Sequence, residues 1–299
     1  MSEAGSPRSD FDELLAILDL EQRDEDVYLG GHPSKNPVRT FGGQMMAQAF
    51  VAASRSLSHP VAPSAMSVHF IAGGDPQFDL EFHVVRLRDE RRFANRRVDV
   101  MQGGQLLTTA MVSYLTGGRG LEHGVGAPAT ADPETLPPID DLLTGYEEVV
   151  PHFVDALRPI EWRYANDPAW IMRDKGESLD HNRVWMKAQG VMPDDPVLHA
   201  AAMVYSSDTT VLDSIITTHG LSWGHDRIFA VSANHSVWFH RPVHFDQWVL
   251  YATASPVAAE SRGLGGGHFF DQQGQLLATV VQEGIVKYFP NRATGSASS

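Results

Sequence analysis

Apolar positions along the chain switch from helical to strand-like spacing, and they do so twice in the same order. Residues 41–57 place apolar side chains three and four positions apart, which predicts a helix with Thr40 as its N-cap. Four segments with strand-like alternation follow, at 64–72, 78–88, 91–101 and 105–115. The second half repeats the pattern with a strand at Arg183–Ala188, a helix at 199–217, and strands at 228–240, 247–257, 261–271 and 275–287. Each half therefore predicts one long helix packed against an antiparallel sheet.

Short repeats in the sequence indicate that one half duplicates the other. Residues 102–110 (QGGQLLTTA) return 170 positions later as 272–280 (QQGQLLATV), and residues 67–70 (SVHF) return 169 positions later as 236–239 (SVWF). We therefore expect an α+β fold with two tandem units. The first unit is expected at 1–118, with a tail at 1–10, and the second unit at 171–290. A connector at 119–170, with a weakly helical patch near 143–157, joins them, and a disordered tail follows at 291–299.

One acidic residue lies at an unexpected position on the second predicted helix. With Ala201 at zero and 100° per residue, Asp208 falls at about −20°, within the apolar stripe, whereas Asp213 falls near about 120° and should face outward. A buried carboxylate is costly unless it is hydrogen-bonded or functional. The first-half helix has no acidic residue, so the fold itself does not require one there.

Two further polar positions differ between the halves. Strand alternation places Gln282 on the apolar face of its strand, where the first half has Val112. Ser232 corresponds to Pro63, and a lone Ser is by itself a weak signal. A buried amide needs hydrogen-bond partners, and Asp208 is one candidate for Gln282, as is an unpaired backbone group.

Composition narrows the classes of partner and chemistry. The net charge of −14, from 23 Lys plus Arg against 37 Asp plus Glu, argues against nucleic acid as a partner. The chain has no cysteine, which excludes thiolate nucleophiles and Cys-based metal sites. No metal or other cofactor is expected, because the spacing of His235, His240 and His244 does not suit metal ligands. No apolar run is long enough to cross a membrane and the N-terminal residues show no signal peptide, so we expect no membrane partner and a cytoplasmic protein.

Several ordered motifs, over nearly the whole chain, resemble the acyl-CoA thioesterase II family. They are Phe41-Gly42-Gly43-Gln44, Tyr205-Ser206-Ser207-Asp208, His235-Ser236-Val237-Trp238-Phe239-His240 and Val281-Gln282-Glu283-Gly284. The resemblance implies a double hot-dog fold, with a helix wrapped by an antiparallel sheet in each unit. It also implies that the enzyme hydrolyses fatty acyl-CoA and that Asp208, Ser232 and Gln282 form its catalytic set. The resemblance favours a homo-oligomer, as a dimer or tetramer, whereas two units joined in one chain also permit a monomer. Asn234 stands where the family usually has Asp, which leaves substrate preference more open than activity.

Substrate-binding residues are expected in two places. Gly42 and Gly43 allow close approach of a substrate carbonyl to the start of the first helix, or serve helix packing alone. Arg88, Arg96 and Arg97 belong to a dense basic cluster. That cluster is either a solvated hairpin face or a site for the phosphates of CoA.

Alternatives for the mechanism and the function remain at this point. Asp208 acts either as general base for water or as a nucleophile that forms a mixed anhydride. A hot-dog hydratase or dehydratase commonly pairs an acid with a His, and no His lies on the Asp208 helix face. A non-catalytic acyl-CoA binding module would tolerate loss of the acidic group, so an intact Asp208 counts against it.

Overall fold

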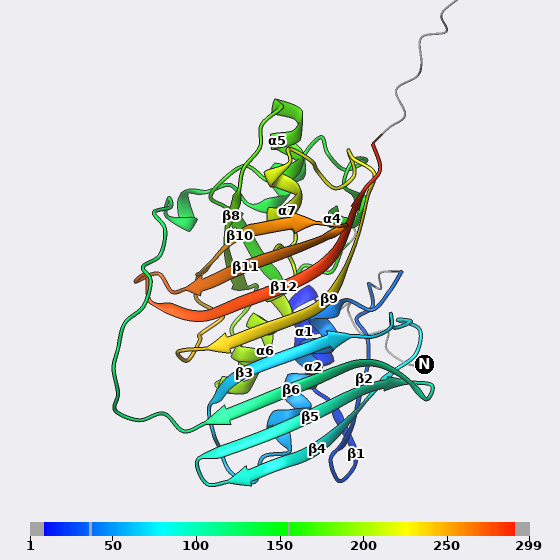
Figure 1. Cartoon of the computed structure of the whole chain (residues 1–299), viewed down its shortest axis with the longest axis vertical. Helices are drawn as coiled ribbons and strands as arrows, with labels where there is room; N and C mark the ends of the chain where they lie inside the picture. Colours follow the sequence, from blue (N-terminus) through cyan, green and yellow to red (C-terminus); the bar gives the residue numbers. More distant parts are fainter. Residues whose placement is uncertain (1–8, 36–37, 155, 291–299) are drawn as a thin grey trace, which may run out of the picture.

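The computed structural model describes residues 9–35, 38–154 and 156–290, and its strands form one antiparallel sheet (Figure 1). The strands are β1 (Glu21–Asp24), β2 (Val27–Gly30), β3 (Pro63–Phe70), β4 (Leu80–Glu90), β5 (Phe93–Gln102), β6 (Gln105–Leu115), β7 (Ile160–Tyr164), β8 (His181–Ala188), β9 (Ile228–Phe239), β10 (Val249–Ala259), β11 (Arg262–Phe270) and β12 (Leu276–Tyr288). Their spatial order is β1-β2-β4-β5-β6-β3-β9-β12-β11-β10-β8-β7. Counted outward from the central β3–β9 pair, the strands of the first half and the corresponding strands of the second half come in the same order. A duplication requires this symmetry.

The centre of the sheet places the repeated segments opposite each other. Ser67 and Ser236, which occupy matching positions in the repeat, are register partners between β3 and β9. The Ser236 hydroxyl donates to the Ser67 hydroxyl at 3.0 Å. An approximate two-fold axis therefore passes through this serine pair.

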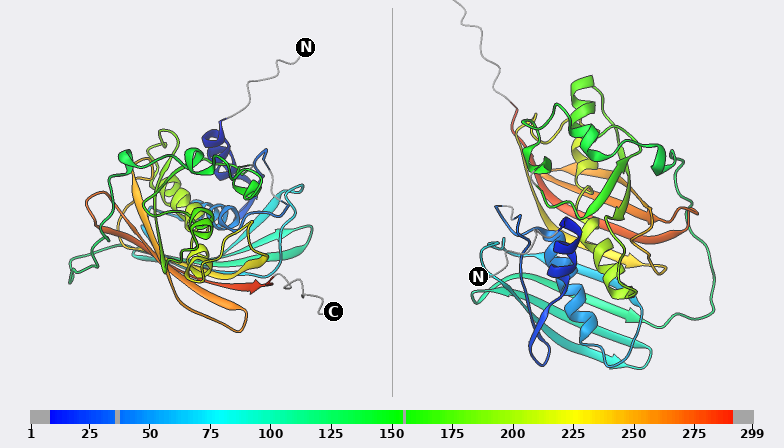
Figure 2. Two further views of the ribbon diagram at one scale, coloured as in Figure 1. Left: turned by 90° about the horizontal axis from the view of Figure 1, so that it is seen from above. Right: turned by 180° about the vertical axis from the view of Figure 1, so that it is seen from behind.

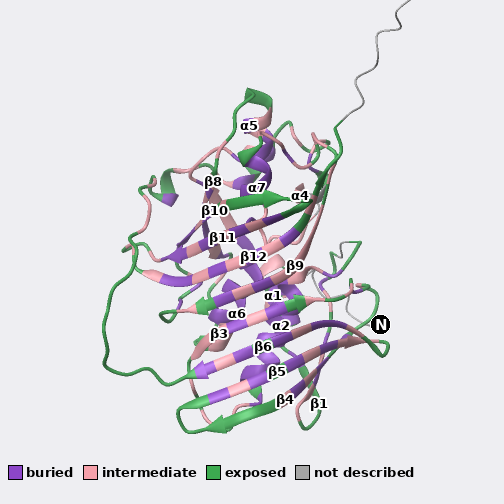
Figure 3. Cartoon of the chain, in the orientation of Figure 1, coloured by how far each residue is buried: buried purple, intermediate pink, exposed green. Residues whose placement is uncertain are grey.

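The helices lie on the concave face of the sheet, which curves around them (Figure 2). They are α1 (Asp10–Leu18), α2 (Gly42–Arg55), α3 (Ile139–Leu143), α4 (Pro151–Val154), α5 (Ala169–Lys175), α6 (Pro196–Ser207) and α7 (Asp213–Thr218), with a 3-10 turn η1 (Pro133–Thr135). Helices α2 and α6 pack against each other, and α2 also contacts β4, β5 and β6. Residues 43–54 of α2 are all buried, because one side meets the sheet and the other meets neighbouring helices (Figure 3).

Two expectations about helix ends are wrong. The N-cap of α2 is Phe41, without a side-chain hydrogen bond, and the Thr40 hydroxyl is buried without a partner. The predicted helix at 199–217 is two helices, α6 and α7, separated by residues 208–212. Hydroxyl groups favour the break: Thr209 donates to the Ser206 carbonyl at 2.6 Å, and Ser207 Oγ lies 2.7 Å from the Val204 carbonyl oxygen. Such side chains compete for the carbonyls that a continuing helix needs.

Other segments have more structure than their sequence suggested. Residues 10–30 form α1, β1 and β2, and Ser9 caps α1 although it was expected in a tail; residues 1–8 and 291–299 lie outside the described residues. The stretch after β6 runs along one side of the molecule from the first half to the second (Figure 1). It then forms η1, α3 and α4, and β7 adds an edge strand beside β8.

A hydrophobic core runs through both halves. It includes Phe50 and Met46 of α2, Val68 of β3, and Val204 and Val237 of the second half. Within the described ranges, no helix is both long enough and apolar enough to cross a membrane.

Candidate active site

Asp208 lies at the C-terminal end of α6 rather than in the middle of a helix. It is the C-cap residue, with φ −86° and ψ −8°. The carbonyl end of a helix disfavours a negative charge, whereas the N-terminal end of α2 favours one. The backbone N–H of Gly43, in the first turn of α2, donates to the Asp208 carboxylate.

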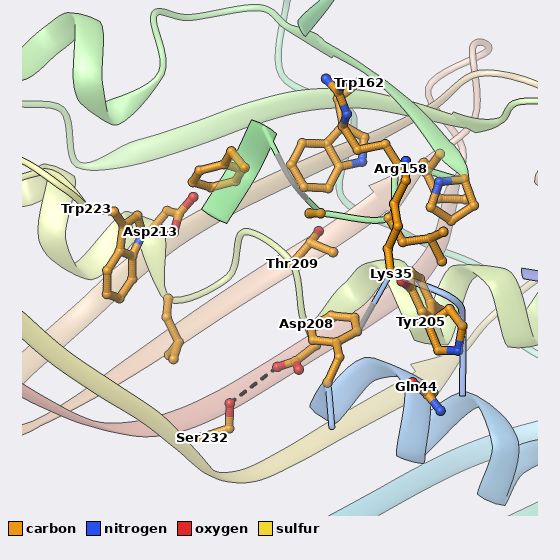
Figure 4. A pocket seen from close by; sticks show the side chains of 18 of the residues that line it. Lys35, Gln44, Arg158, Trp162, Tyr205, Asp208, Thr209, Asp213, Trp223 and Ser232 are labelled. Atoms are coloured by element: carbon orange, nitrogen blue, oxygen red, sulfur yellow. Dashed lines mark hydrogen bonds between the residues drawn. The ribbon is translucent and has the colours of Figure 1, made fainter. Parts of the chain in front are cut away.

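The structure brings Asp208, Ser232 and Gln282 together, although they come from a helix end and two strands. The Ser232 hydroxyl donates to Asp208 Oδ1 at 3.3 Å (Figure 4). Gln282 Nε2 donates to Ser232 Oγ at 2.7 Å and also to the Asp208 carboxylate. Pairing of β9 with β12 places Ser232 opposite Gly284 and sets Gln282 two residues away on the same side of the strand. The donors of this cluster therefore reach the Asp208 carboxylate directly or through Ser232.

Burial sets the protonation behaviour of Asp208. Packed protein raises its pKa to about 6, and the hydrogen bonds from Gln282, Gly43 and Ser232 limit that rise. Desolvation disfavours the charged form of a carboxyl, while donors stabilise it. A pKa near neutrality suits a group that accepts and returns a proton.

A buried histidine orients the Gln282 amide. His235 Nδ1 contacts Gln282 Oε1, and its Nε2 lies 2.9 Å from Ser207 Oγ. Burial lowers the pKa of His235 to about 4, so the ring is neutral at pH 7. Since the amide NH₂ faces Asp208 and Ser232, its oxygen faces the ring, which requires the proton on Nδ1. From its sequence spacing His235 was rejected as a metal ligand, and its contact with Gln282 was not predicted.

The two glycines that begin α2 permit its close approach to α6. A Cβ added at Gly42 would lie 2.6 Å from Asp208 Oδ2, and one at Gly43 would lie 2.4 Å from the Tyr205 carbonyl oxygen. Both distances are shorter than non-bonded atoms allow. Any larger residue would therefore push the start of α2 away from the carboxylate or displace the carboxylate itself.

Asp208 and Ser232 open into a pocket of about 630 Å³ (Figure 4). This size suits a small-molecule ligand. Most of its wall is apolar and comes from four segments, with Phe153 and Trp162 near β7, Tyr205 and Leu212 around Asp208, Phe41 before α2, and Val231 on β9. Among the described lining residues the cations are Lys35 and Arg158.

The arginines expected to bind substrate lie elsewhere, on the β4–β5 hairpin, and none of them lines this pocket. Arg88 pairs with Glu90 at 2.8 Å, and Arg97 pairs with Asp99 at 3.1 Å. Arg96 is fully buried, donates to Ser56 Oγ at 2.7 Å and pairs with Asp89 at 3.0 Å. These contacts stabilise the Arg96 guanidinium in the interior of the first half.

Asp213 was expected to face outward, and this is wrong. The residue is 7% exposed and lines the same pocket as Asp208. The Trp223 indole N–H donates to its Oδ1 at 2.6 Å, and burial raises the pKa of Asp213 to about 7. The break after α6 causes the difference, because it rotates α7 relative to the wheel that a continuous helix would follow.

Comparison with protein families agrees with this architecture in both halves. Residues 153–285 match a family model described as acyl-CoA thioesterase. Residues 32–115 match one described as acyl-CoA thioesterase N-terminal domain.

Individual relatives match along most of their length. The chain is 31% identical to acyl-coenzyme A thioesterase 8 of Homo sapiens, covering 96% of this chain and 93% of that protein. It is 28% identical to acyl-CoA thioesterase 2 of Haemophilus influenzae, covering 92% and 97%.

Solved structures confirm the fold. Acyl-CoA thioesterase II TesB2 from Mycobacterium marinum gives a TM-score of 0.75 at 31% identity, covering 94% of this chain and 99% of that one. A hot-dog protein from Alicyclobacillus acidocaldarius, 19% identical, also gives 0.75, covering 92% and 97%, so the expected hot-dog fold is confirmed. The chain therefore belongs to the acyl-CoA thioesterase II family of thioester hydrolases.

Proposed function

We propose that this protein hydrolyses fatty acyl-CoA to the free acid and CoA, with water as the nucleophile and Asp208 as general base. The observation that carries the proposal is the convergence of Ser232, Gln282 and the Gly43 N–H on a carboxylate that opens into an apolar pocket. A pocket with apolar walls suits an acyl chain, and a carboxylate at its wall suits proton transfer.

In the proposed reaction the oxygen of water bonds to the thioester carbonyl carbon while Asp208 takes a proton from that water. Ser232 and Gln282 hold the carboxylate, and they also position the water beside it. The carbonyl oxygen becomes an oxyanion, which backbone N–H groups in the first turn of α2 stabilise. The carbon–sulfur bond then breaks, and Asp208 returns the proton to the CoA sulfur.

The direction of the substrate follows from the charges around the pocket. Lys35 and Arg158 line it, with side chains that are 51% and 30% exposed. Lys35 pairs with Asp10 and Arg158 with Asp140, and the exposed parts of the two cations still offer a local attraction to CoA phosphates in a chain whose net charge is −14. The CoA group would then lie at this end, with the thioester at Asp208.

A hydratase or dehydratase is less well supported by the same geometry. That chemistry commonly pairs an acid with a free His, whereas both ring nitrogens of His235 are in hydrogen bonds, with Gln282 and Ser207.

Direct attack by Asp208 through a mixed anhydride would give a burst of CoA before the fatty acid appears. The water route predicts that both products appear together in a rapid-quench experiment.

A homo-oligomer remains part of the proposal. Trp238 of β9 and Met111 of β6 are 42% and 39% exposed, and strand alternation with the buried neighbours Val237 and Val112 places them on the sheet face opposite the core. Because β6 and β9 both flank β3, the two side chains lie on one part of this face, where a contiguous apolar patch would favour a protein contact. Light scattering of the purified protein would separate a dimer or tetramer from a monomer.

The variant Gln282→Val tests the function because it copies the residue at the matching position, Val112, of the first half. Thiol release from acyl-CoA should fall by about 10²-fold or more in kcat, because the carboxylate loses a donor and the water loses its position. Gln273→Val makes the same chemical change in an exposed turn and should leave kcat unchanged. Native-like kcat in folded Gln282→Val would remove Gln282 from the catalytic set.

A further inference from the structure

The pocket contains a second carboxyl group that the proposed reaction does not use. Asp213, at the start of α7, is nearly as enclosed as the core around it, yet its side chain lines the cavity. One of its oxygens, Oδ1, accepts from the Trp223 indole at 2.6 Å. An ionised carboxylate can accept several hydrogen bonds. The group therefore has acceptor capacity left on the pocket side.

Asp213 lies away from the cationic end of the pocket. In the view of Figure 4, Asp213 and Trp223 are on one side of Thr209, and Lys35 and Arg158 are on the other. If CoA binds at the cations and the thioester reacts at Asp208, as in the proposed function, the acyl chain extends toward Asp213. This carboxyl then meets the distal part of the chain.

The surroundings of Asp213 are polar as well as buried. Tyr164 is 5% exposed, and its hydroxyl is buried without a hydrogen-bond partner. The charge of Asp213 contributes to the raised pKa of Tyr164, so the two groups are within electrostatic reach. A plain hydrocarbon tail that covers Asp213 would desolvate the carboxyl and give it no partner, which is unfavourable.

We propose that the inner end of the pocket is a subsite for a hydroxyl group carried on the distal part of the acyl chain. The hydroxyl donates to the free side of the Asp213 carboxyl, which Trp223 holds in place. The enzyme therefore prefers ω-hydroxyacyl-CoA to unsubstituted acyl-CoA of the same length, at the lengths that reach Asp213. This inference rests on the proposed function, because it uses the same pocket and the same direction of substrate.

The test measures kcat/KM of the full-length protein on pairs of acyl-CoA substrates, with and without an ω-hydroxyl, in a graded series of chain lengths. At pH 8, where Asp213 with its pKa of about 7 is mostly ionised, the wild-type protein should favour the hydroxylated partner by about tenfold or more over a limited range of lengths, since a hydrogen bond to a charged group is among the stronger kinds. Asp213→Leu should reverse that preference, by helping the plain chain and hindering the hydroxylated one. Asp213→Asn keeps the size of the side chain and its oxygen can still accept from Trp223, so its NH₂ would donate to the hydroxyl oxygen and part of the preference should remain.

The outcomes separate the subsite from the reaction. Equal kcat/KM for both partners at every length overturns the subsite and leaves the proposed function standing. A preference that persists unchanged in folded Asp213→Leu also overturns it. If Asp213→Leu does not fold, the wild-type ratio and Asp213→Asn still decide. No hydrolysis of either partner by the wild-type protein would instead refute the proposed function.

Discussion

Asp208 shows how burial and hydrogen bonding are balanced at one residue. Burial alone would hold the carboxyl neutral, and three donors bring its pKa down to about 6. At pH 7 the group is therefore mostly ionised and still basic enough to take a proton. A surface Asp, with an ordinary pKa of about 3.9, would be a much weaker base.

The pH dependence of kcat/KM follows from this pKa. In the proposed reaction Asp208 must be ionised to act as a base, so kcat/KM should be flat above about pH 6 and fall about tenfold per unit below it. The same measurement on Asp213→Asn should keep that midpoint, because Asp208 is unchanged. A fall that begins near pH 4 would mean that an unperturbed carboxyl controls the rate.

Single residues were predictable where the two halves could be compared. Asp208, Ser232 and Gln282 stood out because the first half lacks them, and the structure brings all three together. Asp213 was misplaced because its orientation depends on a helix break that periodicity does not detect. Arg96 resembled a surface cation in its sequence context, and only the packing of Ser56 and Asp89 around it reveals its burial.

At the scale of elements, the strands were predicted best. Each of the eight strands expected after the two helices is present with ends shifted by a few residues, because half-buried strands alternate clearly. The strands β1 and β2 were missed because four residues give too few positions for a period, and the nine-residue helix α1 was not predicted either. The α6–α7 break was missed because its cause is local bonding of Ser207 and Thr209.

The start of α2 gives a prediction at the same scale. Gly42→Ala should lower kcat by about tenfold or more, because its Cβ would lie 2.6 Å from Asp208 Oδ2. Alanine has a higher helix propensity than glycine by about 1 kcal/mol, which offsets the cost of this close contact. Thermal stability should therefore change little. Gly31→Ala is the control, since its Cβ would meet only Asp79, at 3.8 Å. Unaltered turnover in Gly42→Ala, with the helix intact, would contradict the role given to this close approach.

The whole molecule divides its tasks between two halves that share one sheet. The second half provides the polar trio, and the first half provides the Gly43 N–H and the end of α2 that faces Asp208. We propose that residues 1–118 and 171–290 are duplicated units joined by 119–170. The β3–β9 ladder and the α2–α6 contact tie them together.

This sharing predicts that the halves unfold together. All six tryptophans lie in the second part of the chain, at Trp162, Trp170, Trp185, Trp223, Trp238 and Trp248. Tryptophan fluorescence therefore reports on the second half, whereas far-ultraviolet circular dichroism reports on both. The two signals should give coincident urea transitions, as expected of one cooperative unit. Two separated midpoints would show that the halves are stable independently.

The most direct test of the account is the turnover number of Asp208→Asn. The amide keeps the size of the side chain but cannot take a proton, so kcat for thiol release should fall by about 10²–10⁴-fold while circular dichroism stays native. Asp180→Asn is the matched control, because Asp180 is an exposed carboxylate paired with His181. Turnover by Asp208→Asn within a few-fold of the wild-type value would contradict the claim that this buried carboxylate is the base.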